Sequence, residues 1–366
     1  MFFRIHLSPF FLITKYKPSQ YKDIEIMTNT SSNQTQRISY PMLDLLKFFF
    51  CFMVVAIHVD IFRSREEQPL FYYLQTASVP FFFAVSGFLL NQKMLSGRQV
   101  LKRARRYLFL YLIWTLIYLP LSISIILNSD ASLLSSLSDY LRRILFYGEY
   151  QLSWALWYLH SLVISMLIIA WMRSHRWPDY SIFLVGLLLY YSIRWLNESA
   201  VAGTLPYGLQ QPVAWLYKIF IGFRSLQGLV YVSIGMLIAR YQHLLARIRI
   251  SHLSSINGQV FLSLLLIGGS LFDTPIRKLL MAAGITLMGV CCSSVRNNRH
   301  NLLLRQLSTL VYLLHLLIIA TLQSFSFCSD SYQSFYISVC ILSIGASLLI
   351  LYLSDKPLGR WLKHLY

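Results

Sequence analysis

The chain has 366 residues, of which 56% are hydrophobic and only 13% are charged, and its mean hydropathy is +0.56. Soluble domains carry about 25% charged residues, so this composition is typical of a membrane protein. The net charge of +18 does not indicate nucleic-acid binding, because the basic residues lie in short segments between apolar stretches. The five cysteines show neither metal-binding nor disulfide spacing, and we expect no metal site.

The start of the chain is polar and basic, with a Ser/Thr/Asn/Gln run from Thr28 to Gln36. We expect residues 1–36 to form a disordered cytoplasmic tail and residues 37–366 to form one membrane domain. The apolar run Phe10–Ile13 is too short for the core of a signal peptide. Met27 is an alternative start, just before the patterned part of the chain.

Ten apolar segments follow, and each is a candidate transmembrane helix. They cover approximately residues 41–62, 70–92, 107–127, 153–172, 181–196, 219–239, 258–272, 276–293, 307–325 and 333–353. The fifth, seventh and eighth are shorter than the ~20 residues that a crossing helix needs. The sequence therefore predicts an all-α fold, a polytopic membrane bundle of about ten transmembrane helices.

The distribution of lysine and arginine predicts how this bundle is oriented. With the N-terminus inside, roughly two thirds of the 32 basic residues lie in inner segments and roughly a fifth in outer loops. Cytoplasmic loops carry an excess of Lys and Arg. We therefore expect a cytoplasmic N-terminus and, after an even number of spans, a cytoplasmic C-terminus.

Three ionisable side chains interrupt the first segment: Asp44, Lys47 and His58. Lys47 and His58 are about three helical turns apart, so they share a face, roughly 16 Å apart along the axis. Asp44 lies one turn before Lys47 and can pair with it. Ionisable groups within a span mark function by default, and an imidazole suits proton transfer. The structural alternative is that Asp44 and Lys47 are interfacial anchors and His58 snorkels outward.

The second segment and the loop after it hold two more candidate features. Ser86 precedes Gly87 in an apolar run, where such a pair packs against another helix or offers a hydroxyl to a ligand. Arg103 and Arg106 belong to the basic cluster Lys102–Arg106. Topology or anionic headgroups explain such a cluster, whereas the alternative is binding of a phosphorylated donor such as coenzyme A.

The remaining candidates lie near the fourth segment and in the ninth. Tyr158 belongs to the aromatic run Trp154–His160, where Trp and Tyr are expected as interfacial anchors. Glu149 precedes that run, either as a solvated loop carboxylate or as a group that shares a water-filled mouth with His58. His315 is embedded in apolar sequence, as a structural or a catalytic histidine.

Together these motifs resemble the signature of acyltransferase family 3, a family of integral membrane acyltransferases. That family opens with Leu-Asp, two residues, Arg or Lys, ten residues and His, which Asp44, Lys47 and His58 match. The similarity spans most of residues 37–355 and continues, in the family's order, at Phe82–Leu90, Arg103–Arg106, Leu156–Leu159 and Tyr312–His315.

The resemblance implies a multi-pass enzyme of the bacterial cytoplasmic membrane. It would transfer an acyl group, commonly acetyl, from cytoplasmic acyl-CoA to a hydroxyl of a surface carbohydrate or glycolipid intermediate. The chain resembles the stand-alone type, without the hydrolase-like domain that some members carry. Residues 181–295 match the family only in hydropathy, so no donor or acceptor contact is assigned there.

On this hypothesis His58 deprotonates the acceptor hydroxyl or transiently carries the acyl group. Lys47, positioned by Asp44, would hold the phosphates or the acyl carbonyl of acetyl-CoA together with Arg103 and Arg106. Glu149 is a further catalytic candidate, and Ser86 a further donor contact. The rival classes are a transporter or flippase of glycan intermediates and a non-catalytic scaffold. Transporters often have two related halves, and residues 41–195 and 215–353 show no such similarity.

Overall fold

The computed structural model describes residues 39–62, 68–92, 95–219, 221–247, 258–272, 274, 276–291, 299–325 and 331–366. All of them belong to one compact unit, Ile38–Tyr366. The predicted tail, residues 1–36 with Met27, lies outside the described residues and stays a prediction.

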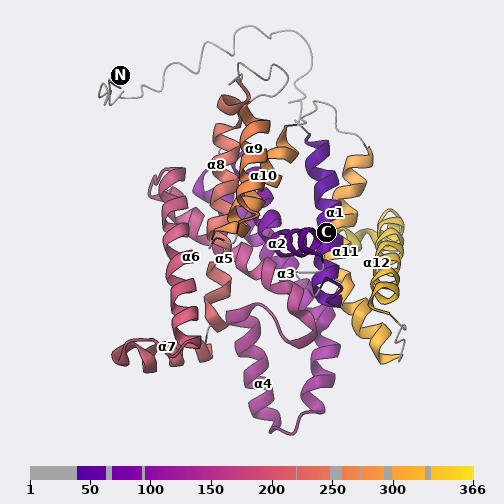
Figure 1. Cartoon of the computed structure of the whole chain (residues 1–366). Coiled ribbons are helices and arrows are strands. Elements are labelled where there is room, and N and C mark those ends of the chain that lie inside the picture. Colours follow the sequence, from indigo (N-terminus) through magenta and orange to yellow (C-terminus); the bar gives the residue numbers. More distant parts are fainter. Residues whose placement is uncertain are drawn as a thin grey trace, which may run out of the picture. The chain divides into compact units, whose positions relative to one another are not determined.

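The regular structure of these residues is helical throughout (Figure 1), which confirms the all-α prediction. The α-helices are α1 (Pro41–Val59), α2 (Pro69–Asn91), α3 (Gly97–Leu127), α4 (Leu133–Arg142), α5 (Trp157–Ser174), α6 (Asp179–Val201), α7 (Tyr207–Ile219), α8 (Gly228–Arg247), α9 (Gly258–Gly269), α10 (Arg277–Val290), α11 (Arg299–Ser324) and α12 (Tyr332–Ser354). Short 3₁₀ or π segments adjoin them: η2 (Arg143–Tyr147), η3 (Gln151–Leu156), η4 (Ile221–Leu226) and η5 (Pro357–Leu365).

Local sequence explains where several helices begin. α1 and α2 start at Pro41 and Pro69, and a proline in the first turn has no N–H to leave unpaired. α3 starts after Ser96, whose backbone N–H donates to the Gln99 side chain at 2.8 Å. These signals set the helix ends independently of tertiary packing.

Seven helical stretches are long and apolar enough to cross a membrane. Five of them are the helices α1, α2, α3, α11 and α12. The other two are the stretch Leu133–Ser174, which includes α5, and the stretch Arg224–Arg247, which includes α8. The other three predicted spans correspond to α6, α9 and α10, which are not among the seven. With 12 and 14 residues, α9 and α10 are about 18 and 21 Å long, short of a ~30 Å hydrocarbon core.

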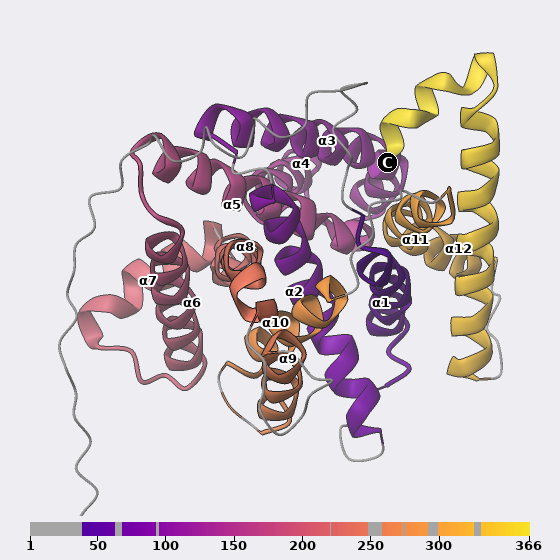
Figure 2. The same cartoon turned by 90° about the horizontal axis from the view of Figure 1, so that it is seen from above.

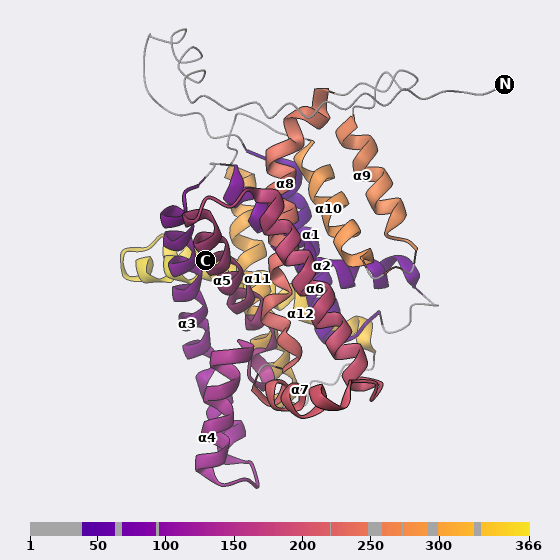
Figure 3. The same cartoon turned by 90° about the vertical axis from the view of Figure 1, so that its left-hand side faces the viewer.

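The helices of this unit surround a central group. Seen from above, α12 borders one side and α6 and α7 the opposite side, with α1, α2 and α8 between them (Figure 2). The short helices α9 and α10 pack against each other as a pair (Figure 3). α1 packs against α11 and α3 packs against α5, which brings α1, α2, α3, α5 and α11 around one interior region.

The closest helix contact joins α2 and α8. A methyl group at Gly87 would collide with the carbonyl oxygen of Val232, and one at Gly235 would collide with that of Ala84. Small residues allow two backbones to approach in this way. The packing role considered for the Ser86–Gly87 pair therefore belongs to Gly87.

An ionic network around a buried carboxylate ties four helices together. Asp179, only 6% exposed at the start of α6, accepts hydrogen bonds from Arg173 at 2.9 Å, Arg240 at 3.3 Å and Asn91 at 3.1 Å. These partners come from α5, α8 and α2. A buried carboxylate needs such compensation, so the network fixes the relative positions of all four helices.

Candidate functional site

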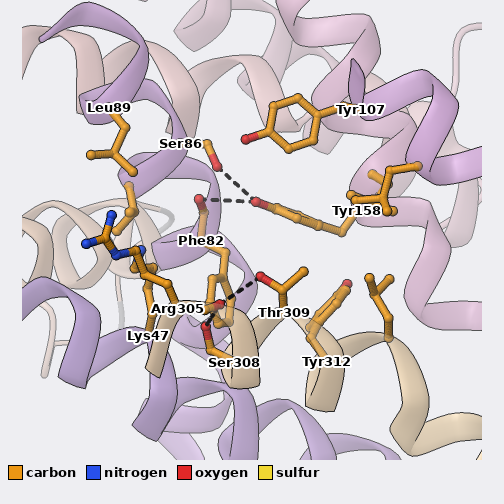
Figure 4. Close-up of a pocket in the computed structure, with 14 residues that line it drawn as sticks. Lys47, Phe82, Ser86, Leu89, Tyr107, Tyr158, Arg305, Ser308, Thr309 and Tyr312 are labelled. Carbon is orange, nitrogen blue, oxygen red and sulfur yellow. Dashed lines mark hydrogen bonds between the residues drawn. The ribbon is translucent and has the colours of Figure 1, made fainter. Parts of the chain in front are cut away.

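A cavity of about 240 Å³ lies between α1, α2, α3, α5 and α11 (Figure 4). Most of its wall is apolar or aromatic, with two cations at one side. Its lining consists of Lys47, Phe82, Val85, Ser86, Leu89, Tyr107, Leu110, Tyr158, Leu159, Arg305, Ser308, Thr309, Tyr312 and Leu313. Two of the predicted binding residues, Lys47 and Ser86, and the candidate Tyr158 therefore meet in one cavity.

The cationic side of the cavity is organised by Asp44. One of its carboxylate oxygens lies 3.0 Å from Lys47 Nζ, and the other lies 3.1 Å from Arg305 Nε on α11. The Asp44 side chain is 6% exposed and that of Lys47 13% exposed. One carboxylate thus holds two cations, and the cluster keeps a net positive charge toward the cavity.

The opposite side carries a pair of hydroxyl groups within hydrogen-bond distance of each other. The Tyr158 and Ser86 hydroxyls lie 3.0 Å apart, and Tyr158 also donates to the carbonyl oxygen of Phe82 at 3.3 Å (Figure 4). Tyr158 is therefore not a membrane-interface anchor. Its ring closes the cavity between α2 and α5.

The predicted phosphate-binding arginines line a second pocket, of about 640 Å³. Arg103 and Arg106 lie there one turn apart on α3, and Arg103 also donates to the Leu89 carbonyl oxygen at 3.2 Å. The two pockets share Tyr107, Leu110 and Thr309 in their walls, so they adjoin each other.

His58 lies apart from both pockets, next to His315. The two rings are 5.1 Å apart between centroids, and His58 also lies 6.4 Å from the exposed ring of Trp154. His315 is fully buried, and its Nδ1 lies 3.3 Å from the Val311 carbonyl oxygen. Its Nε2 has no hydrogen-bond partner among the described residues. Because a carbonyl can only accept, Nδ1 carries the proton and Nε2 offers a lone pair.

Tyr312 separates the cavity from this histidine pair. It lines the cavity, its ring lies 6.0 Å from that of His315, and its hydroxyl donates to the Ala155 carbonyl oxygen at 2.7 Å. Along α11, Arg305, Tyr312 and His315 therefore face Asp44, the cavity and His58 in that order. This order means that α1 and α11 run in the same direction.

Glu149 is held by Arg224 on η4. Its carboxylate lies 3.2 Å from Arg224 Nη1, and the Arg224 guanidinium stacks 3.9 Å from the Trp157 ring. The Glu149 side chain is 17% exposed, so it is not a solvated loop carboxylate. Arg224 interacts electrostatically with His58, which places a cation near the imidazole.

Sequence reasoning missed Arg305 and Arg224. In the sequence, Arg305 is one of the basic residues of a segment expected on the inner side. It belongs, however, to a helical stripe whose spacing of three, four, seven and ten residues was visible: Arg305, Ser308, Thr309, Tyr312 and His315. Arg224 had no comparable signal, because its partners come from a segment far away in the sequence. Among the described residues, no group of three His, Cys, Asp or Glu side chains could hold a metal ion.

A family model described as an acyltransferase domain matches residues 40–352. No curated protein and no solved structure matches the chain. The match covers most of the chain and every site residue named above. The chain is therefore a multi-pass integral membrane protein that belongs to acyltransferase family 3, a family of membrane-bound O-acyltransferases.

Proposed function

We propose that this acyltransferase moves an acyl group, acetyl in the simplest case, from cytoplasmic acyl-CoA to a hydroxyl of a surface carbohydrate or glycolipid intermediate. One observation carries the proposal: the Arg103/Arg106 pocket adjoins the Lys47 cavity, and the His58–His315 pair follows this cavity along α1 and α11. A donor with an anionic end and a long neutral arm would place its anionic end in the Arg103/Arg106 pocket and its arm in the Lys47 cavity.

The donor's phosphates would lie at Arg103 and Arg106, whose guanidinium forks match phosphate oxygens. Its arm would pass Tyr107, Leu110 and Thr309 into the cavity, where Lys47 and Arg305 provide positive charge and Ser86 and Tyr158 provide hydroxyls. Lys47 and His58 are about 16 Å apart along α1, so they cannot contact the same carbonyl. Lys47 therefore serves the donor's arm, and the thioester must pass Tyr312 to react.

On the far side of Tyr312 from the cavity, His58 would act as the general base. The acceptor oxygen attacks the thioester carbonyl while its proton passes to His58; the C–S bond then breaks, and the departing thiolate takes that proton. Arg224, which interacts electrostatically with His58, would stabilise the negative charge that develops on the carbonyl oxygen. The lone pair on His315 Nε2 would accept the other N–H of His58 and so orient its ring, the role of the third group in catalytic triads.

The same arrangement supports the orientation expected from the distribution of basic residues. Since α1 and α11 run in the same direction, an odd number of crossings leads from the end of α1 to the start of α11, and α2, α3, α5, α6 and α8 provide five. If α6 crosses, this parity is kept whether the short pair α9 and α10 crosses or enters and returns. With the basic residues inside, both ends of the membrane domain face the cytoplasm, in a bacterial cytoplasmic membrane.

The proposal is tested with inside-out membrane vesicles supplied with radiolabelled acetyl-CoA. His58→Ala should lower the rate of label transfer to the glycan fraction at least about 100-fold at equal protein level. His175→Ala is the matched control, because this exposed histidine lies in the loop after α5, and it should leave the rate unchanged. Full transfer by the His58 variant would contradict the proposal, and movement of unlabelled glycan without acylation would indicate a carrier.

A further inference from the structure

The last residues of the chain fold back onto the bundle. The segment η5 begins after α12, beyond the residues that the acyltransferase family model matches. The buried indole of Trp114 on α3 donates to the Leu365 carbonyl oxygen at 3.1 Å. The Tyr366 hydroxyl lies 2.9 Å from that of Ser354. Figure 2 shows the segment reaching from α12 toward α3. Its end is thus held against two helices.

The amphipathic pattern of η5 explains which residues face the bundle. Leu365 is buried in the same apolar cluster as Trp114, and Leu362 packs against that cluster. Between them, Lys363 and His364 line the pocket that holds Arg103 and Arg106. The fold therefore adds two basic side chains to this pocket from a segment more than 250 residues away in the sequence.

The pocket is basic on two sides. Arg103 and Arg106 come from α3, and Lys363 and His364 come from η5; of the described residues that line it, none is Asp or Glu. Lys363 pairs with Asp355 at 3.3 Å, but both side chains are largely exposed, at 53% and 80%. Such an exposed ion pair contributes little to stability, so Lys363 can leave Asp355 and bind a more highly charged anion. A ligand here needs negative charge at more than one position.

Resting on the proposed function, we infer that Lys363 and His364 bind the phosphate of the donor that lies farthest from the thioester, which in coenzyme A is the 3′-phosphate of the adenosine. The two pockets meet at Tyr107, Leu110 and Thr309, which sets the direction of the donor: the arm that leads to the thioester lies in the cavity and the nucleotide end lies in the Arg103/Arg106 pocket. Arg103 and Arg106, one turn apart, suit the diphosphate, which leaves η5 for the remaining phosphate.

An anionic lipid headgroup offers the same phosphate chemistry. Continuity with the Lys47 cavity favours the donor, since a lipid headgroup has no arm to place there. The two sources can be distinguished by nucleotide affinity. If the site binds a donor phosphate, its substitution changes nucleotide affinity in any lipid. If it binds a headgroup, the substitution has an effect only where anionic lipid is present.

The test is direct binding of coenzyme A and of 3′-dephospho-coenzyme A to the full-length protein in nanodiscs of zwitterionic lipid, by isothermal titration calorimetry. Wild-type protein should bind coenzyme A about tenfold more tightly, the effect of one charge-assisted contact. Lys363→Gln should remove this difference by weakening coenzyme A alone, and His364→Asn should reduce it. Lys356→Gln, a change in a lysine that stacks on Tyr352 outside the pocket, should leave both affinities unchanged.

Each other outcome is decisive. Equal weakening of both ligands by Lys363→Gln, or no weakening of either, overturns the assignment of Lys363 to the 3′-phosphate. A Lys363→Gln effect that appears only in nanodiscs with phosphatidylglycerol assigns the residue to a lipid headgroup and also overturns it. If wild-type protein binds neither nucleotide, the donor of the proposed function is itself wrong, which is a separate result. Unchanged melting temperatures of the variants show that η5 remains folded.

Discussion

The carboxylate of Asp44 on α1 pairs with the guanidinium of Arg305 on α11, with Nε 3.1 Å from Oδ2. Because the other oxygen of the same carboxylate holds Lys47, this one side chain joins two helices and neutralises one of the two cations at the cavity. The pair therefore links the packing of α1 on α11 to the charge of the site.

Replacing Asp44 with Asn should destabilise the protein. It removes the carboxylate that lies between Lys47 and Arg305, which we expect to cost about 2–3 kcal/mol of the free energy of unfolding, less than for a fully buried pair because Arg305 is 36% exposed. Unfolding in mixed micelles measures this. The double variant Asp44→Asn with Arg305→Gln should recover part of the loss; no recovery would mean that the two residues are not coupled.

The charge of Lys47 should matter more than its shape. Lys47→Arg keeps a cation beside Asp44 and should retain the rate of acetyl transfer within about tenfold, whereas Lys47→Met should lose up to about 100-fold, the effect of removing one charged hydrogen-bond donor that binds the acyl donor. Rates in inside-out vesicles at equal protein level compare them. Equal losses in both variants would show that acetyl transfer does not depend on a positive charge at position 47.

The hydrogen bond between Ser86 and Tyr158 should appear as a coupling between the two side chains. Ser86→Ala and Tyr158→Phe each remove the same 3.0 Å contact, at a cost of about 1 kcal/mol. Tyr158→Phe also removes the bond to the Phe82 carbonyl oxygen, so the double variant should cost about as much as Tyr158→Phe alone rather than the sum. A double-mutant cycle on unfolding free energies measures the coupling, and strict additivity would mean that no such bond forms.

The contact of α2 with α8 should not tolerate a methyl group. Gly87→Ala and Gly235→Ala each place a Cβ against a carbonyl oxygen of the other helix, and we expect a loss of about 1–3 kcal/mol in unfolding free energy. Gly345→Ala in α12 is the control, because nothing lies within 4 Å of its Cβ. That change should be neutral or stabilising by up to about 1 kcal/mol. Similar behaviour of all three variants would argue against the close approach of α2 and α8.

The buried network around Asp179 should contribute more to stability than an exposed ion pair. Asp179→Asn leaves Arg173 and Arg240 without their anion and should cost about 3 kcal/mol. Glu198→Gln removes the exposed partner of Arg194 and should change stability by less than about 0.5 kcal/mol. Melting temperatures in one detergent give the comparison, and equal shifts would contradict the structural role of the network.

Features that depend on a single helix could be predicted from the sequence. The ion pair of Asp44 with Lys47 follows from a spacing of three residues, and both Lys47 and His58 lie on the side of α1 that meets α11. The helical class and seven of the ten predicted spans follow in the same way from apolar length. The short pair α9 and α10 shows the limit of this reasoning, because hydropathy alone does not reveal where a helix ends.

By itself, then, the sequence determined the membrane class, the family and the face of α1 that carries the ionisable residues, since helical periodicity and hydropathy are local properties. Only the tertiary structure decided that Arg305 shares Asp44, that Arg224 pairs with Glu149, and that Lys363 and His364 join Arg103 and Arg106. These partners come from helices far apart in the chain. Their distances depend on how the helices pack, which no spacing within one segment specifies.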